Sequence, residues 1–123
     1  RVINLEKTNS RNLSRDLIPD PVDLIVCDVS FISIMKALPP ALSLAATDAR
    51  LVTLVKPQFE LGQGNIGKGG IVTMPVSDQY NWITMHIIPF LTSLEWTVQG
   101  LIESPIKGGD GNTEFLLGAY RET

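Results

Sequence analysis

The sequence predicts an α/β fold built on a mostly parallel β-sheet whose last strand runs antiparallel. Two continuous apolar runs, 23–28 and 50–55, have the length of strands and lack the alternation typical of a half-exposed strand. A segment with helical signals follows each run, and two further strand-like runs close the chain with only a turn-rich segment between them. Strand alternating with helix indicates parallel strands, and strand directly following strand indicates an antiparallel pair.

The first element expected is a short strand at 2–5, followed by a polar, loop-like stretch at 8–21. The run 23–28 is the next strand. Because it is apolar throughout, we expect it to be buried on both faces of the sheet.

A helix is expected from Ser33, a candidate N-cap, to Ala46. Pro39 and Pro40 should break or restart it, because proline lacks the backbone N–H that a helix interior uses. The run 50–55 is then a second buried strand.

The second half of the chain predicts one helix and a strand pair. The helix should begin near Pro75 or Ser77 and kink at Pro89. Its apolar face repeats with helical period and consists of Ile83, Ile87, Phe90, Leu91 and Leu94. The runs 97–103 and 114–120 flank the segment KGGDGN and should form the antiparallel pair.

Composition indicates one ordinary globular domain. The chain has 123 residues, 44% hydrophobic and 19% charged, and no apolar run of membrane-spanning length. Its formal net charge of −3 supplies no overall attraction to nucleic acid, so any RNA contact must be local. The single cysteine, Cys27, is expected to be a small buried residue in a reducing compartment, which favours the cytoplasm. Arg1 is not preceded by methionine or a signal-peptide pattern, so we expect a longer parent protein.

Three ionisable residues stand at strand ends that should meet at one edge of this sheet. Asp28 and Lys56 follow two strands joined by a helical crossover, which places both at the carboxyl-terminal edge. Glu114 begins a strand that returns antiparallel to the same edge. Taken singly, each residue has an ordinary alternative: Asp28 as a turn cap, Lys56 as a surface lysine, and Glu114 as the start of an exposed strand.

Five strings, VINLEKTN, DLIVCDVSFIS, LVTLVKPQFE, IGKGGIV and ESPIKGGDGNTEFLL, occur in this order and span almost the whole chain. In them the sequence resembles the FtsJ-like, S-adenosylmethionine-dependent RNA ribose methyltransferases, in the branch that contains TlyA and haemolysin A. The resemblance implies a Rossmann-like methyltransferase sheet without its first two strands. Residues 1–123 are then a partial methyltransferase domain, from the third strand onward, of a protein that methylates the ribose 2′-hydroxyl of ribosomal RNA.

The resemblance also implies site residues. The family surrounds the acceptor hydroxyl with a Lys, Asp, Lys, Glu set, whose last three members correspond to Asp28, Lys56 and Glu114, while the first lysine would precede Arg1. Lys56 is then the base or the hydroxyl-orienting group, and the two carboxylates hold it and meet the positive charge of the cofactor. The residues expected near S-adenosyl-L-methionine are Glu6, Lys7, Thr8, Asn9 and Asp28.

The glycine-rich loop 62–70 matches two phosphate-binding patterns by its letters. Gly62, Gly64 and Gly67 satisfy G-x-G-x-x-G, but Lys68 is followed by glycine where a P-loop has serine or threonine, and no helix is expected to begin there. A flexible loop beside the active edge, with Lys68 near RNA backbone, is the better interpretation. A disordered connection is the alternative.

The remaining candidates carry weaker signals. His86 lacks partners at metal-ligand spacing, so no metal is implied, and Trp82 and Trp96 are expected in packing rather than base stacking.

Partners follow from what the family has and this chain lacks. Family members hold ribosomal RNA through a small N-terminal RNA-binding module, and its absence leaves a small-molecule or protein acceptor open, as well as a non-catalytic or haemolysin-like binding domain. We expect exposed strand edges, including 2–5, to pair with the missing part of the protein or to self-associate. The isolated chain should bind S-adenosylmethionine weakly or not at all.

Overall fold

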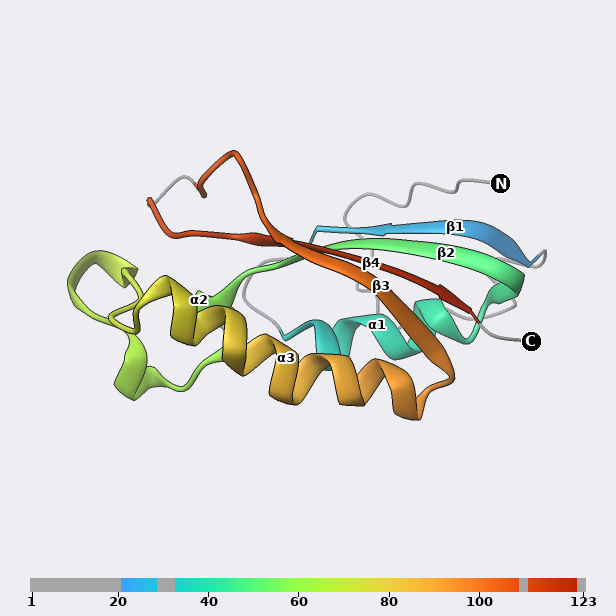
Figure 1. Ribbon diagram of the computed structural model, residues 1–123, viewed down its shortest axis with the longest axis horizontal. Helices are drawn as coiled ribbons and strands as arrows, with labels where there is room; N and C mark the ends of the chain where they lie inside the picture. The colour runs from blue at the N-terminus through green and yellow to red at the C-terminus, as the bar shows by residue number, and fades with distance from the viewer. Residues whose placement is uncertain (1–20, 29–32, 109–110, 122–123) are drawn as a thin grey trace.

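A four-stranded mixed sheet organises the chain (Figure 1). The computed structural model describes residues 21–28, 33–108 and 111–121. Its strands are β1 (Val22–Cys27), β2 (Ala45–Val55), β3 (Trp96–Glu103) and β4 (Phe115–Arg121), in the spatial order β1-β2-β4-β3. β1 runs parallel to β2, and β4 is antiparallel to both β2 and β3. The predicted α/β class with an antiparallel last strand is confirmed, whereas the predicted strand at 2–5 lies outside the described residues.

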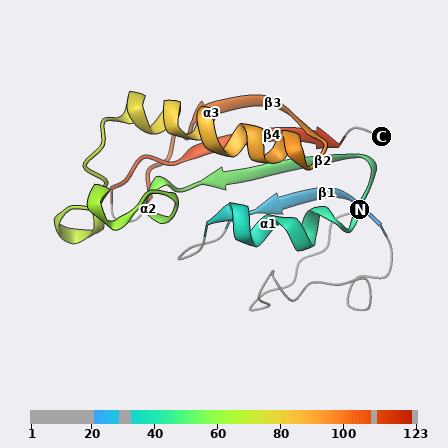
Figure 2. The same cartoon turned by 90° about the horizontal axis from the view of Figure 1, so that it is seen from below.

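The two longer helices, α1 (Ile34–Leu42) and α3 (Val76–Ser93), lie on the same face of this sheet (Figures 1 and 2). From Ala49 to Val55 in β2 and from Phe115 to Ala119 in β4, every second residue points to these helices and is buried, as alternation along a strand requires. The core between the layers contains Leu38, Leu51, Val55, Ile83, Ile87, Leu91, Trp96, Phe115 and Leu117.

The opposite face of the sheet carries exposed apolar side chains. Val26 is 65% exposed, Val52 42% and Ile102 59%, and within the described ranges no helix covers them. The prediction that the strand at 23–28 is buried on both faces is therefore wrong for the structure described. Burial on both faces needs a second layer, and only the helix-covered face has one here.

Helix α1 begins where the sequence predicted and ends earlier. Ser33 is its N-cap and accepts a hydrogen bond from the backbone N–H of Met35. Pro39 and Pro40 lie inside the helix without breaking it, which corrects the expectation of a break. Their missing N–H groups leave only the carbonyls of Met35 and Lys36 without the usual helical donor, and the helix stops two residues later.

Strand β2 begins at Ala45, so the last residues expected in the helix belong to the sheet. Val22 pairs with Ala45, and the register then shifts, so that Leu24 pairs with Arg50. Asp48, which lies within this register shift, has a positive φ of 65°. Pairing with β1 has overridden the helical preference of the alanines, as tertiary context commonly does.

Helix α3 confirms the predicted apolar face at Ile83, Ile87 and Leu91 and continues through Pro89 to Ser93. Leu94, also predicted on this face, follows the end of the helix and is 38% exposed. A short helical turn, α2 (Pro57–Glu60), follows β2, and two 3₁₀ turns, Gln63–Asn65 and Lys68–Gly70, precede α3.

None of the helices among these residues is both long enough and apolar enough to cross a bilayer.

Candidate active site

The ends of three adjacent strands bring the predicted site residues to one edge of the sheet (Figure 1). Asp28 directly follows β1 and Lys56 directly follows β2, and parallel pairing places both at the carboxyl-terminal edge. Val55 pairs with Phe115 in the antiparallel register of β2 and β4. Glu114, the residue before Phe115, therefore stands across from Lys56 at the neighbouring strand end.

Asp28 and Lys56 form an ion pair. The Lys56 Nζ atom lies 2.6 Å from the Asp28 Oδ1 atom, and the side chain of Lys56 is only 13% exposed, against 61% for Asp28. The ammonium is therefore held in a half-enclosed position by a carboxylate that still faces solvent. Such a contact restricts the rotamers of both side chains.

Glu114 is a buried carboxylate in a polar corner of the molecule. It follows Asn112 and Thr113, which are also buried, and its carbonyl accepts a hydrogen bond of 2.7 Å from the N–H of Ser104. This bond extends the pairing of β3 and β4 beyond the strands proper. The backbone of Glu114 is thereby fixed at the edge where Lys56 emerges.

Asn112 was not singled out by the sequence, and it ties the glycine-rich loop to this corner. Its Oδ1 atom accepts from the N–H of Val72 and its Nδ2 atom donates to the carbonyl of Gly70, both at 2.9 Å. The dipeptide Gly-Asn before Thr113 signalled only a turn. The partners of Asn112 lie about 40 residues earlier in the chain, so local sequence patterns do not reveal them.

The loop between α2 and α3 is built as a turn with its own hydrogen bonds. Gly69 and Gly70 have positive φ values of 76° and 80°, which only glycine adopts readily. Ile66 and Val72 form an isolated antiparallel bridge. Helix α3 begins at Val76, well after Lys68, so the loop does not open directly into a helix N-terminus as a P-loop does.

Cys27, next to Asp28, does not supply a nucleophile. Burial raises the pKa of the Cys27 thiol, a hydrogen bond with Thr53 acts in the opposite direction, and the Asp28 carboxylate raises it further. A thiol with a raised pKa stays protonated and unreactive at neutral pH. The expectation of a small buried residue is met in part, because the side chain is half-buried.

The aromatic and histidine candidates serve packing. Trp96 is buried in the core, as predicted, and Trp82 stacks on the exposed His86 with ring centroids 4.5 Å apart. The His86 Nδ1 atom lies 2.9 Å from the carbonyl of Trp82. In the part of the chain that the structure describes, no three His, Cys, Asp or Glu residues group as metal ligands would.

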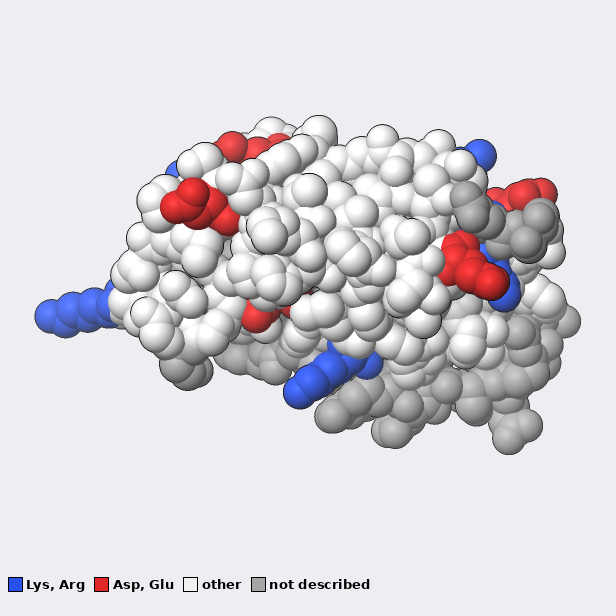
Figure 3. All heavy atoms as spheres, turned by 60° about the horizontal axis from the view of Figure 1, so that its bottom comes forward, with Lys and Arg blue, Asp and Glu red and all other residues white. Residues whose placement is uncertain are grey.

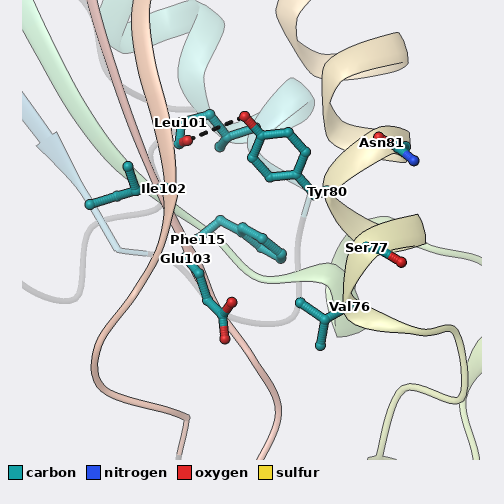
Figure 4. A pocket seen from close by; sticks show the side chains of 8 residues that line it. All are labelled: Val76, Ser77, Tyr80, Asn81, Leu101, Ile102, Glu103 and Phe115. Atoms are coloured by element: carbon teal, nitrogen blue, oxygen red, sulfur yellow. Dashed lines mark hydrogen bonds between the residues drawn. The ribbon is translucent and has the colours of Figure 1, made fainter.

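An open groove of about 580 Å³ lies between the start of α3 and the end of β3 (Figure 4). The side chains of Val76, Tyr80 and Phe115 turn into it, whereas Ser77 and Asn81 point away. The Tyr80 hydroxyl reaches the carbonyl of Leu101 at 3.5 Å. No lysine or arginine belongs to its lining, so the groove is not suited to a phosphate.

Charged side chains are sparse on the helix-covered side of the molecule. Figure 3, which turns that side forward, shows lysine and arginine side chains separated by wide neutral areas. RNA-binding surfaces instead gather cations into a patch or stripe. The described surface in this view has no such patch.

Four of the predicted cofactor residues, Glu6, Lys7, Thr8 and Asn9, lie outside the described residues. Asp28 is the one member of that set whose place is known, at the end of β1.

Similarity to known proteins extends over nearly the whole chain. The family profile described as FtsJ-like methyltransferase matches residues 1–121. This chain belongs to the FtsJ-like methyltransferase family. The resemblance found in the sequence strings is thereby confirmed.

Relatives within the FtsJ-like family are substantially longer than this chain. The 16S/23S rRNA (cytidine-2′-O)-methyltransferase TlyA of Mycobacterium tuberculosis is 40% identical over 123 residues, which are 100% of this chain and 45% of TlyA. The rRNA methyltransferase YqxC of Bacillus subtilis is 39% identical over 118 residues, which are 95% of this chain and 41% of YqxC. The chain thus spans less than half the length of these curated relatives.

A solved structure supports the fold. The crystal structure of a protein from Lactococcus lactis described as a hemolysin aligns with a TM-score of 0.85 and 34% identity over 99% of this chain and 58% of that chain. At this identity the match supports the methyltransferase-like sheet found here.

Proposed function

We propose that the natural protein containing this chain transfers a methyl group from S-adenosyl-L-methionine to a ribose 2′-hydroxyl of ribosomal RNA. The observation that carries the proposal is the Asp28–Lys56 ion pair at the carboxyl-terminal edge of an FtsJ-family sheet, with Glu114 across from Lys56. The names of the relatives TlyA and YqxC, both of which refer to rRNA methyltransferases, support rRNA as the acceptor.

The residues at this edge fit a cationic cofactor. Asp28 presents a largely solvent-facing carboxylate at the strand end where α/β sheets bind ligands. When bound, the cofactor supplies an electrophilic methyl group on a sulfonium. A nearby carboxylate stabilises positive charge, so Asp28 suits that position.

Lys56 is assigned to the acceptor. Its Nζ atom, held by Asp28, orients the ribose 2′-oxygen for in-line attack on the methyl carbon. The ribose hydroxyl must lose its proton as its oxygen is methylated, and Lys56 would accept that proton at Nζ once its own ammonium proton has been released to solvent. Asp28 and Glu114 position the amine and offset positive charge.

The surrounding protein supplies the remaining parts of the domain. In this proposal residues 1–123 form the portion of the methyltransferase domain from its third strand onward. The exposed apolar side chains Val26, Val52 and Ile102 on the bare sheet face support a second layer in the complete domain.

The test is transfer of labelled methyl from S-adenosyl-L-methionine to ribosomal RNA by the purified full-length natural protein. Digestion to nucleosides should recover the label as 2′-O-methylribonucleoside. Label on a base, or none above a protein-free control, would contradict the proposal. Lysis of erythrocytes without methyl transfer would instead favour the haemolysin-like alternative.

A further inference from the structure

A half-buried carboxylate, that of Glu60, connects the residues that follow β1 with those that follow β2. Glu60, the last residue of α2, accepts a hydrogen bond from the Ser33 hydroxyl at 2.6 Å and another from the Ile34 backbone N–H at 2.8 Å. We call these two contacts the Glu60 bridge. They connect residues that are 26 and 27 positions apart in the chain.

The Glu60 bridge lies close in sequence to both residues of the ion pair. Glu60 is four residues after Lys56, and Ser33 is five residues after Asp28. Two contacts therefore link the residues around the ends of β1 and β2: the 2.6 Å ion pair of Asp28 with Lys56 and the bridge of Ser33 with Glu60. Two contacts restrict the placement of Lys56 more than the ion pair alone would.

We infer that Glu60 is a positioning residue for the proposed methyl transfer, acting by holding the Lys56 turn against the N-terminus of α1. This inference rests on the proposed function of Lys56. The carboxylate of Glu60 accepts from Ser33 and Ile34, and the α2 turn, Pro57–Glu60, connects it to Lys56.

The ionisation of Glu60 indicates that the bridge does more than stabilise the fold. Burial raises the pKa of Glu60, and the hydrogen bonds from Ser33 and Ile34 only partly offset that effect. Keeping an ionised carboxylate in this place opposes folding at neutral pH. The two hydrogen bonds nevertheless fix both carboxylate oxygens, so the contribution of Glu60 is to geometry rather than to stability.

The first test measures turnover in the full-length natural protein. Glu60→Ala removes both contacts and should lower kcat about 10- to 100-fold, while the Kd for S-adenosyl-L-methionine stays within about twofold. Glu60→Gln can keep both, by accepting from Ile34 and donating to Ser33, and should restore most of the turnover. Glu95→Ala, at the exposed turn between α3 and β3, is the matched control and should behave as wild type.

The second test does not depend on activity. The rate at which an amine-selective reagent modifies Lys56, followed by mass spectrometry, should rise several-fold in Glu60→Ala, because the lysine loses its fixed, mostly enclosed position. If Glu60→Ala does not fold, Glu60→Asp serves instead, since its shorter side chain cannot span both contacts. An unchanged modification rate in the folded variant would overturn the inference. If the wild-type protein transfers no methyl group, that result contradicts the proposed function, whereas the modification rate still tests whether Glu60 positions Lys56.

Discussion

Lys56 and Asp28 show how far single residues could be assigned from the sequence. Each follows a strand, and the crossover rule sufficed to predict that they meet. Glu60 could not be found this way, because its partners Ser33 and Ile34 belong to another element and no local pattern encodes the contact. Side chains whose role depends on a strand end are predictable, whereas those whose role depends on how two turns pack are not.

Replacing Lys56 should remove the central group of the proposed reaction. In the full-length natural protein, Lys56→Ala should lower kcat by at least about 100-fold, with little change in S-adenosyl-L-methionine affinity, because Lys56 is assigned to the acceptor side. Single-turnover methyl transfer and calorimetric titration measure the two quantities. Lys36→Ala, an exposed lysine on α1, is the control. Wild-type turnover in Lys56→Ala would show that another group does the chemistry.

The raised pKa of Glu60 has a defined effect on stability. Because burial lifts this pKa above its ordinary value of 4.5, the folded state binds the proton more tightly than the unfolded state. The stabilising contribution of protonation is complete below about 4.5 and is lost as pH rises through the folded-state pKa. Urea unfolding of wild type and Glu60→Gln should therefore show the variant gaining relative stability from about pH 4 to about pH 7. A constant difference would contradict the assigned shift.

At the scale of elements, the sequence predicted which helices and strands form better than it predicted where each one ends. The Ser33 cap marked the start of α1, and the period of Ile83, Ile87 and Leu91 marked α3. The end of α1 and the early start of β2 were missed, because the pairing of Ala45 with Val22 depends on the whole sheet. Local signals set where an element begins, and tertiary pairing decided where this one ended.

The hydrogen bonds of Asn112 should stabilise the loop before α3. Asn112→Ala leaves the N–H of Val72 without its acceptor in a buried place, which should cost about 1–3 kcal/mol. Hydrogen exchange at Val72 should accelerate more than exchange in the core of β2, because the effect is local. Asn81→Ala, exposed on α3, is the control. Equal exchange at Val72 in wild type and Asn112→Ala would show that the contact contributes nothing.

At the scale of the whole molecule, helices α1 and α3 cover one face of the sheet, and no helix of the described residues covers the other face. The sequence predicted strands buried on both faces, and the apolar character of Val26 and Val52 on the bare face explains that prediction. Composition along a strand reports the environment of the complete domain, whereas the described structure contains only one helical layer (Figure 2). The directions of the strands, by contrast, followed from connection rules, whereas the place of β4 between β2 and β3 was not predicted.

The isolated 123-residue chain should bind S-adenosyl-L-methionine weakly or not at all. The resemblance to the family implies a glycine-rich turn for the methionine end of the cofactor, and we identify none in this sequence, so we expect weak binding. Calorimetric titration of the chain and of the full-length natural protein should give measurable binding only for the latter. Micromolar binding to a monomer of the isolated chain would place the cofactor site within these residues.

The most direct test of the account is a map of ribose methylation in ribosomal RNA. Cells would be compared that carry the wild-type gene, no gene, or the gene with Lys56→Ala, at equal protein levels. We expect at least one 2′-O-methylated nucleotide to be present with the wild-type gene and absent from the other two. Identical maps in all three would contradict the assignment of this chain to rRNA ribose methylation.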